Sequence, residues 1–387
     1  MKKIAVVSGT RAEYGLLAPL MHAIRASIRL ELQVLVTGSH LLPEFGLTVQ
    51  VIERDGFTVD RRIPEISSAA DGRDVAHQVG KGTIAFATAL EELEPDAVVI
   101  LGDRYEMFAA TSAAFFLGIP ILHLHGGELT RGAFDDSIRH AISQLAQHHA
   151  VAAPEYRDRL IRAGAHPGTV HVVGGLGVDS LNQISLIPRE ELELELDVEF
   201  SSLVFLVTYH PVTRGERDTA GDVNELIAAL DFFPDATMIF TMPNTDPEHQ
   251  RVVEVLERQV ANRHNWFLFS ALGSANYLSI MAIASVVIGN SSSGLTEAPS
   301  LGTPTVNVGS RQEGRLSAKS VISCPTKSSE IVFSIRQALS DGFVTSIQGA
   351  VSPYGLPGAA ARVLQILETT FFDNLGEKEY YDLPDDS

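Results

Sequence analysis

Short apolar runs alternate with longer amphipathic segments along most of the chain. A short run that is apolar throughout is typical of a strand buried on both faces, as in a parallel sheet covered by helices. In the first half, such runs predict strands at residues 4–7, 32–36, 97–101, 119–124 and 170–173, and the amphipathic segments predict helices at 14–26, 75–93, 105–117 and 137–147. This alternation predicts a doubly wound α/β domain.

The pattern starts again after residues 182–200, where the apolar periodicity is weak. The second half predicts strands at 203–207, 237–240, 266–269, 286–288 and 305–308, with helices at 223–230, 247–260, 275–283, 295–301 and 330–339 and a last helix at 359–368. We therefore expect a domain boundary near residues 175–200. Two doubly wound domains bind ligands at the carboxyl ends of their strands, so we expect the site in the cleft between them.

Composition narrows the functional classes. The 387 residues fit two domains, and 45% hydrophobic with 20% charged residues is typical of a globular protein. The net charge of −19 disfavours nucleic acid and anionic membranes as partners, although a few local cations can still bind a phosphorylated small molecule. The single cysteine, Cys324, excludes an intramolecular disulfide and a multi-cysteine zinc site. Because no signal peptide or membrane helix is evident, we expect a soluble cytoplasmic protein.

Polar side chains follow the predicted strands of the first half. Gly9-Thr10-Arg11 forms a glycine turn before a helix, which indicates either an anion site or a plain turn with a surface arginine. The turn fits neither the dinucleotide fingerprint nor the P-loop. Asp103 and Arg104 follow strand 97–101, where they would act in catalysis or form an ion pair that caps the next helix.

Histidines and paired acids follow the next strand. His123 and His125 share a face, which fits a metal pair or, because no third ligand is evident, a titrating histidine at the cleft. Asp135 and Asp136 open a helix, with Asp136 expected as its N-cap and the other acid free for proton transfer. His148 and the histidine after it, His149, are expected to end that helix and to interact with its C-terminal dipole.

Small hydroxyl residues mark the second half. Gly289, Asn290, Ser291, Ser292 and Ser293 lie between a strand and a helix, which suits a diphosphate because backbone N–H groups, hydroxyls and a helix dipole act together. Further polar groups accompany this turn. Glu297, expected in the first turn of the helix, could accept a ribose diol, and Arg311 supplies a cation after the next strand.

The order of these motifs resembles that of the hydrolysing UDP-N-acetylglucosamine 2-epimerases of sialic acid biosynthesis, over essentially the whole chain. The resemblance rests on residues 9–14, 37–40, 102–104, 126–128, 135–140, 210–213, 289–292 and 309–312. It implies two Rossmann-like domains in a GT-B-like arrangement. The first would comprise residues 1–178, joined by a C-terminal helix in 356–387, and the UDP-binding second would comprise 179–355.

The resemblance also implies roles for single residues. Asp103 and Asp135 match the catalytic carboxylates, and Glu128 joins them in the expected catalytic set. His125 stands where many members carry glutamate, so we expect it to be a changed acid/base partner. The expected UDP-binding set is Arg11, His40, Arg104, His210, Asn244, Ser291, Ser292, Glu297 and Arg311. The resemblance implies no metal and no cofactor, no nucleic-acid or membrane partner, and a homodimer or homotetramer.

The implied reaction converts UDP-N-acetylglucosamine and water to N-acetylmannosamine and UDP through 2-acetamidoglucal. Three alternatives stay open: the same chemistry on a UDP-2,4-diacetamido-trideoxyhexose of the legionaminic acid route, a non-hydrolysing epimerase, and a GT-B glycosyltransferase. A non-catalytic nucleotide-sugar sensor would not need both Asp103 and Asp135. The segments 102–104 and 210–213 favour hydrolysis, and residues 352–354 and 380–384 look more like the sialic acid branch.

Overall fold

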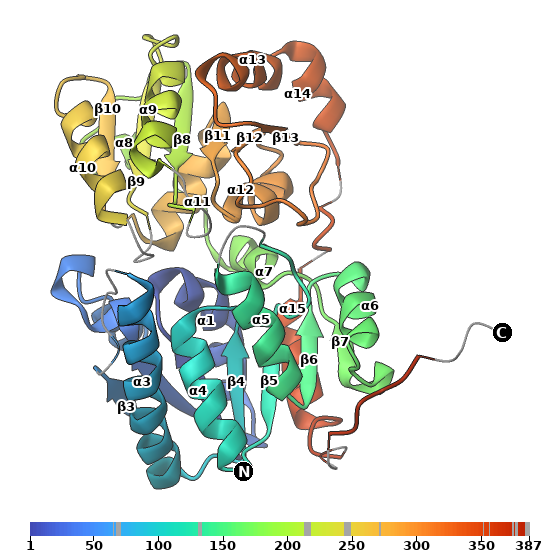
Figure 1. Cartoon of the computed structure of the whole chain (residues 1–387). Helices are drawn as coiled ribbons and strands as arrows, with labels where there is room; N and C mark the ends of the chain where they lie inside the picture. Colours follow the sequence, from blue (N-terminus) through green and yellow to red (C-terminus); the bar gives the residue numbers. More distant parts are fainter. Residues whose placement is uncertain are drawn as a thin grey trace. The chain divides into compact units, whose positions relative to one another are not determined.

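The computed structural model describes all residues except 65, 67–70, 131–133, 213–217, 244–248, 271, 351, 356, 374, 376, 377 and 384–387, and only the backbone of 180, 182 and 183. The chain forms two compact units (Figure 1). The first unit comprises Met1–Glu128, Phe134–Ser180 and Tyr354–Ser387. The second unit comprises Leu129–Ala133 and Leu181–Pro353.

A parallel sheet organises the first unit. Among the described residues its order is β3-β2-β1-β4-β5-β6-β7, with β1 (Lys2–Ser8), β2 (Leu30–Thr37), β3 (Arg61–Ile63), β4 (Ala97–Leu101), β5 (Ile121–Leu124), β6 (His148–Val151) and β7 (Val170–Val172). The five strands predicted from apolar runs are confirmed. β3 and β6 were not predicted, because β3 is three residues long and β6 begins with two histidines. The order reverses between β1 and β4, so the loops after these strands diverge at this point.

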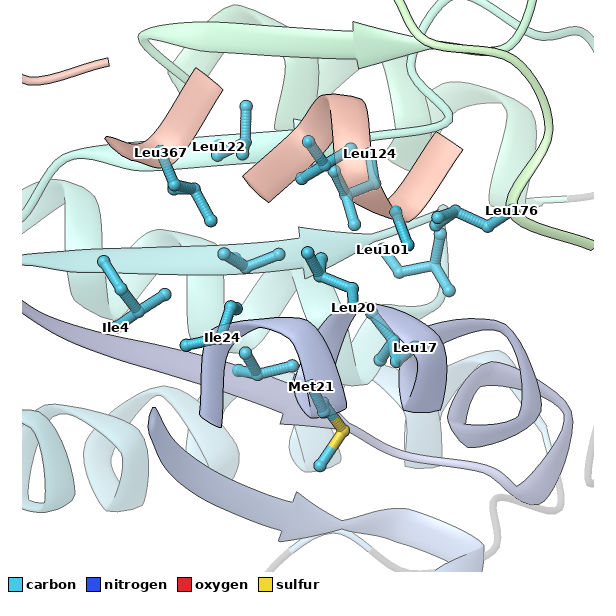
Figure 2. Packing of buried hydrophobic residues seen from close by; sticks show 14 of the residues in the cluster. Ile4, Leu17, Leu20, Met21, Ile24, Leu101, Leu122, Leu124, Leu176 and Leu367 are labelled. Atoms are coloured by element: carbon cyan, nitrogen blue, oxygen red, sulfur yellow. The ribbon is translucent and has the colours of Figure 1, made fainter. Parts of the chain in front are cut away.

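Helices cover both faces of this sheet because side chains alternate along its buried strands. Ile4 and Val6 pack against α1 (Arg11–Ala26), α2 (Val49–Arg54) and α15 (Ala359–Glu368), as Figure 2 shows for Ile4 and the neighbouring leucines. Ala5 and Val7 pack on the other face, against α3 (Gly72–Leu93), α4 (Tyr105–Phe116) and α5 (Phe134–Leu145). Each face thus has its own apolar core.

The last helix belongs to the first unit. α15 has the predicted bounds, and its N-terminal N–H groups are capped by Asp179, whose carboxylate accepts from Gly358, from Ala359 (3.0 Å) and from Ala360 (2.5 Å). Asp179 lies on α7 (Leu176–Gln183), which follows α6 (Pro154–Arg162). Short 3₁₀ turns at Gly38–Leu41, Pro43–Phe45 and Pro167–Thr169 complete this unit.

The second unit repeats the architecture. Its described strands run in the order β10-β9-β8-β11-β12-β13, with β8 (Val204–Thr208), β9 (Thr237–Thr241), β10 (Trp266–Phe269), β11 (Val286–Gly289), β12 (Thr305–Val308) and β13 (Val321–Cys324). Its helices are α8 (Arg189–Leu196), α9 (Thr219–Leu230), α10 (His249–Val260), α11 (Gly273–Ile283), α12 (Ser293–Thr296), α13 (Ser328–Ala338) and α14 (Asp341–Ile347), with a 3₁₀ turn at Ala298–Leu301. The order reverses between β8 and β11, as it does between β1 and β4.

One predicted helix of the second unit is wrong. The segment 295–301 is not one helix: it contains only the end of the short α12 (Ser293–Thr296) and then a separate 3₁₀ turn at Ala298–Leu301. Pro299 explains the break, because proline has no N–H to donate and disfavours helical geometry in the residue before it. In the described part of the chain, no helix is long and apolar enough to cross a membrane.

Candidate active site

Three adjacent strands of the first unit carry the candidate residues. β1, β4 and β5 are neighbours in the sheet, and Arg11, Asp103 and His125 lie just beyond their carboxyl ends. Parallel strands end at the same edge, so this edge gathers the groups that the sequence suggested. Asp135, which opens α5, follows β5 along the chain.

A buried arginine contacts the first of these carboxylates. Arg139, 1% exposed on the inner side of α5, donates from Nη2 to Oδ2 of Asp103. Its Nη1 lies 4.0 Å from Oδ1 of Asp136. Sequence reasoning gave Arg139 no role, although its spacing of four residues from Asp135 places both on one side of a helix. The pairing orients Asp103 through a charge-assisted hydrogen bond.

The expected capping role of Asp136 is wrong. α5 begins at Phe134, so Asp135 and Asp136 both lie inside its first turn. There a negative charge interacts favourably with the helix dipole without serving as the N-cap. Asp135 is half-buried, whereas Arg139 of the same helix is fully enclosed.

His125 has an unusual backbone and two hydrogen bonds. Its φ of 62° lies in the left-handed region, which costs a side-chain-bearing residue free energy. Nδ1 lies 2.8 Å from Oε1 of Glu128, and Nε2 lies 3.3 Å from the backbone N–H of Leu176. Because a backbone N–H can only donate, Nε2 accepts and the ring proton is on Nδ1. The ring therefore links Glu128 to the start of α7.

The neighbouring histidine, His123, is engaged inside the unit. Its Nε2 lies 2.7 Å from the carbonyl oxygen of Gly102, and its Nδ1 lies 2.9 Å from the hydroxyl of Ser143. Burial lowers the pKa of His123 to about 4. Among the described residues, no group of three or more histidine, cysteine or acidic side chains could hold a metal ion.

The expectation for His148 and His149 is wrong. Both lie in β6 and not at the end of α5, which stops at Leu145. His148 stacks on His171 of the next strand, with ring centroids 5.6 Å apart. Burial lowers the pKa of His149 well below its usual value, and neither of its ring nitrogens has a hydrogen-bond partner among the described residues.

The turn after β1 contains a buried carboxylate. Glu13 accepts from the N–H groups of Gly9 (2.7 Å) and Thr10 (3.1 Å), and Thr10 caps α1 in return. Burial raises the pKa of Glu13 to about 7, against the opposing attraction of Arg104. The guanidinium of Arg104 also pairs with buried Glu106, with Nη2 to Oε1 at 3.1 Å. Sequence reasoning missed both glutamates.

His40 is enclosed within the first unit. It is 0% exposed, with Nε2 lying 2.9 Å from the hydroxyl of Ser8 and Nδ1 lying 2.8 Å from that of Thr48. Burial lowers the pKa of His40 to about 4. Both ring nitrogens are thus occupied by protein groups.

In the second unit, β8, β11 and β12 are neighbours, and their ends carry His210, the turn 290–292 and Arg311. The amide of Asn290 accepts from the backbone N–H of His210 (2.7 Å) and donates to its carbonyl oxygen (2.8 Å). The carbonyl oxygen of Asn290 in turn accepts from Nη1 of Arg311 (3.2 Å). Asn290 therefore ties the ends of three strands together. Asn244, another expected ligand residue, lies outside the described residues.

The turn after β11 differs from expectation at its helix. Ser291 and Ser292 precede α12, which has only four residues, so the expected helix dipole is reduced to one turn. Glu297 follows α12 and does not lie in its first turn. The hydroxyl of Thr296 donates to the carboxylate of Glu297.

The buried histidines predict a loss of stability in acid. His40 and His123 have native pKa values of about 4, below the ordinary 6.5, so the unfolded chain binds more protons between pH 6.5 and 4. Each histidine should cost roughly 3 kcal/mol of unfolding free energy as the pH falls through this window. The raised pKa of Glu13 has the opposite effect, because the folded protein binds this proton more tightly than the unfolded chain. As the pH falls, Glu13 therefore offsets the loss of stability caused by about one histidine. His149, whose pKa burial lowers well below its usual value, adds a further loss in the same direction. We therefore expect a net loss of at least roughly 3 kcal/mol between pH 7 and 4, measured by urea unfolding. An unfolding free energy that stays constant or rises as the pH falls from 7 to 4 would contradict this prediction.

The sequence matches the profile of the family described as UDP-N-acetylglucosamine 2-epimerase over residues 22–368. It is 41% identical over 322 residues to the GDP/UDP-N,N'-diacetylbacillosamine 2-epimerase (hydrolyzing) of Campylobacter jejuni, covering 83% of this chain and 84% of that protein. It is 32% identical over 393 residues to the polysialic acid biosynthesis protein P7 of Escherichia coli, covering 100% of this chain and 98% of that protein.

The fold is similar to that of UDP-GlcNAc 2-epimerase from Neisseria meningitidis, solved bound to UDP-GlcNAc. The TM-score is 0.82 at 20% sequence identity, and the match covers 95% of this chain and 99% of that one. Together with the two parallel sheets, this likeness confirms the predicted class of two Rossmann-like α/β domains of the GT-B-like fold.

Proposed function

The chain belongs to the UDP-N-acetylglucosamine 2-epimerase family, and from this premise we propose that it is a hydrolysing 2-epimerase of a UDP-linked 2-acetamido sugar. The observation that carries the proposal is the contact between buried Arg139 and Asp103, because the same helix α5 also presents Asp135. Asp135 lies on α5, and Asp103 is held by a side chain of the same helix. Two carboxylates positioned in this way suit a reaction in which one proton is removed and one is returned. The 41% identical Campylobacter relative is named as a hydrolysing enzyme, which favours hydrolysis over return of a UDP-sugar.

The proposed reaction has two balanced steps. The C1–O bond to UDP breaks while one carboxylate takes the C2 proton, so that the C–H electron pair forms the C1–C2 double bond of a glycal. Water then adds across this bond, with its hydroxyl going to C1 and a proton reaching C2 from the opposite face. The products are UDP and the free C2-epimeric sugar. Asp103 and Asp135 are proposed as the proton-transfer groups.

Departure of UDP requires groups that stabilise the growing negative charge on the diphosphate. In the first unit, Arg11 supplies a cation at the turn after β1, whereas the charge of Arg104 is partly balanced by Glu106. In the second unit, the proposed diphosphate groups are Ser291, Ser292 and Arg311. The hydrogen bond from Arg311 to the carbonyl oxygen of Asn290 supports this, because it holds the guanidinium beside the serine turn.

His125 is proposed to support the carboxylates through Glu128. Its Nδ1–H donates to Glu128, and its Nε2 accepts from Leu176, so the ring is already committed in the first unit. A neutral histidine held in this way orients its acidic partner. His40, with both nitrogens occupied, is proposed to order the turn after β2 for UDP rather than to contact it.

Two sugars are candidates for the substrate. The Campylobacter relative is named for GDP- or UDP-linked N,N'-diacetylbacillosamine, a 2,4-diacetamido sugar, and the identity favours this sugar, which we propose in its UDP-linked form. UDP-N-acetylglucosamine, the substrate first expected from the motifs, is the second candidate, and the description of the matching family supports it. The two sugars differ at C4 and C6, away from the reacting carbons, so the same groups could serve either one.

The reaction and the substrate can be tested together. With each UDP-sugar in D2O, we expect free UDP and a 2-epimeric sugar that carries deuterium at C2, because the proton returned to C2 comes from solvent. The products are identified by NMR, and the ratio of kcat/KM for the two sugars decides the substrate. A 2-epimeric UDP-sugar as main product would instead show a non-hydrolysing epimerase. Sugar transfer to an added acceptor would show a glycosyltransferase.

A further inference from the structure

A lysine outside the proposed site caps the helix that carries two of its residues. Lys378 follows α15, and its ammonium group donates to the carbonyl oxygens of Ser143 (2.9 Å), Gln144 (2.6 Å) and Ala146 (2.7 Å). These oxygens lie at the C-terminal end of α5, where carbonyls lack partners within the helix. The N–H of Gln147, which would extend the helix, donates instead to Ile121. Lys378 thus satisfies the end of α5 and places a positive charge at the negative end of its dipole.

The segment around Lys378 is itself fixed to the first unit. The backbone N–H of Tyr381 donates to the carbonyl oxygen of Gly164 (2.9 Å), and the ring of Tyr381 packs edge-on to His166, with centroids 5.4 Å apart. A Cβ added to Gly164 would lie 2.2 Å from the ring of Tyr380, so this ring sits directly on the glycine. Residues 378–381 therefore form an anchored strap, and Lys378 can hold α5 in a set position.

A second chain of contacts connects α5 to Asp103. The carbonyl oxygen of Gly102 can only accept, so Nε2 of His123 carries the proton and Nδ1 accepts from the hydroxyl of Ser143 on α5. Burial keeps His123 neutral by lowering its pKa to about 4, which preserves this arrangement at neutral pH. Gly102 has a φ of 80° and directly precedes Asp103. α5 thus contacts this turn through His123 and, through Arg139, the carboxylate itself.

We propose that Lys378 is a positioning residue for Asp103 and Asp135. It acts by fixing the C-terminal end of α5, where Ser143 contacts His123 of β5 and, through it, the Gly102 turn. The proposal rests on the proposed function, which gives the two carboxylates their role. A helix of 12 residues is a rod of about 18 Å, so a shift at its end moves both Arg139 and Asp135. A misplacement of about 1 Å at reacting groups can cost up to ~100-fold in rate.

The first test is kinetic. Lys378→Met removes the ammonium group and keeps most of the stem, so we expect kcat to fall about 10-fold with KM within about twofold of the unchanged chain. Lys378→Arg, which can still donate to carbonyl groups, should recover most of the rate. Lys81→Met, on the exposed face of α3, is the matched control and should leave both constants unchanged. An unchanged kcat in Lys378→Met, or an equal loss in Lys81→Met, would overturn the proposal.

Ser143→Ala tests the chain of contacts. It should lower kcat in the same way, and the double variant with Lys378→Met should lose less than the product of the two single losses, because both act through α5. Ser112→Ala on α4, which removes only a bond to the carbonyl oxygen of Phe108, is its control. If the loss of kcat in the double variant equals the product of the two single losses, Lys378 and Ser143 act independently, and the proposed coupling through α5 is contradicted.

A readout without substrate separates this proposal from the proposed function. In NMR spectra of the ¹⁵N-histidine-labelled protein, Ser143→Ala and Lys378→Met should both shift the Nδ1 signal of His123, assigned with His123→Gln. Far-UV circular dichroism and melting curves check that each variant is folded. If neither UDP-sugar is hydrolysed by the unchanged chain while the signal shifts, the proposed function fails and α5 is still positioned by Lys378. If the sugars are hydrolysed but the signal is unmoved by Lys378→Met, the inference fails alone.

Discussion

Asparagine in place of Asp103 or of Asp135 is expected to lower kcat by at least about 100-fold, the usual scale for a positioned proton-transfer group. The amide keeps the size and most hydrogen bonds of the carboxylate but cannot accept a proton at neutral pH. Release of UDP at saturating substrate measures the effect. Calorimetric titration should show little change in UDP affinity, since neither residue is proposed to contact the diphosphate.

Asp136→Asn supplies the matched control for this pair. Asp136 lies beside Asp135 in the first turn of α5 and also faces Arg139, at 4.0 Å. Its loss should change kcat by less than about threefold, because Asp136 is not proposed to transfer a proton and its contact with Arg139, at 4.0 Å, is long for an ion pair. Near-normal turnover in Asp103→Asn would contradict the assignment of proton transfer to that residue. A large loss in Asp136→Asn would show that the two neighbouring acids had been assigned in the wrong order.

The second large effect is expected at Gly289, the last residue of β11. Its φ is 131°, and a Cβ added there would lie 1.9 Å from the carbonyl oxygen of Thr208 on β8. Gly289→Ala must therefore push apart two paired strands and also strain its own backbone. We expect a loss of at least about 4 kcal/mol in stability, and a fall of about 10 °C or more in the melting temperature, measured by calorimetry.

Gly302→Ala isolates the backbone part of that cost. Gly302 also has a positive φ, 71°, but a Cβ added there would meet nothing within 4 Å. Its substitution should cost only about 1 kcal/mol, the price of the left-handed conformation. Equal losses in the two variants would mean that the contact with Thr208 relaxes at little cost and that Gly289 is needed for its conformation alone.

The fold was predictable where one local signal dominates. β4 was placed at its observed bounds because all five of its residues are apolar. β12 was placed at its bounds because its alternating residues, with valine at every second position, lie between Pro304 and Gly309. β6 was missed because its first two residues are histidines, which become buried only through the neighbouring strands. Local hydrophobicity cannot report burial that the tertiary structure imposes on polar residues.

The site was predictable as a set of strand ends but not as a set of contacts. Motifs after β1, β4 and β5 identified the edge of the sheet, because chain order and strand order together decide which loops are neighbours. The partner of Asp103 could not be derived, since Arg139 lies 36 residues along the chain and reaches it only after α5 packs on the sheet. For the same reason, the sequence did not show that His40 is enclosed by Ser8 and Thr48.

The division of the chain has a consequence for the order of events during synthesis. The second unit is complete once the ribosome has passed residue 353, whereas the core of the first unit includes Val363, Leu367 and Phe371, which are made later. The first unit therefore has one sheet face that α1 and α2 cover without α15 until that helix is made. The carboxylate of Asp179 likewise lacks the N–H donors of Gly358 and Ala359 until this segment is made. Folding during translation, which usually runs from the amino end, is here completed in the reverse order.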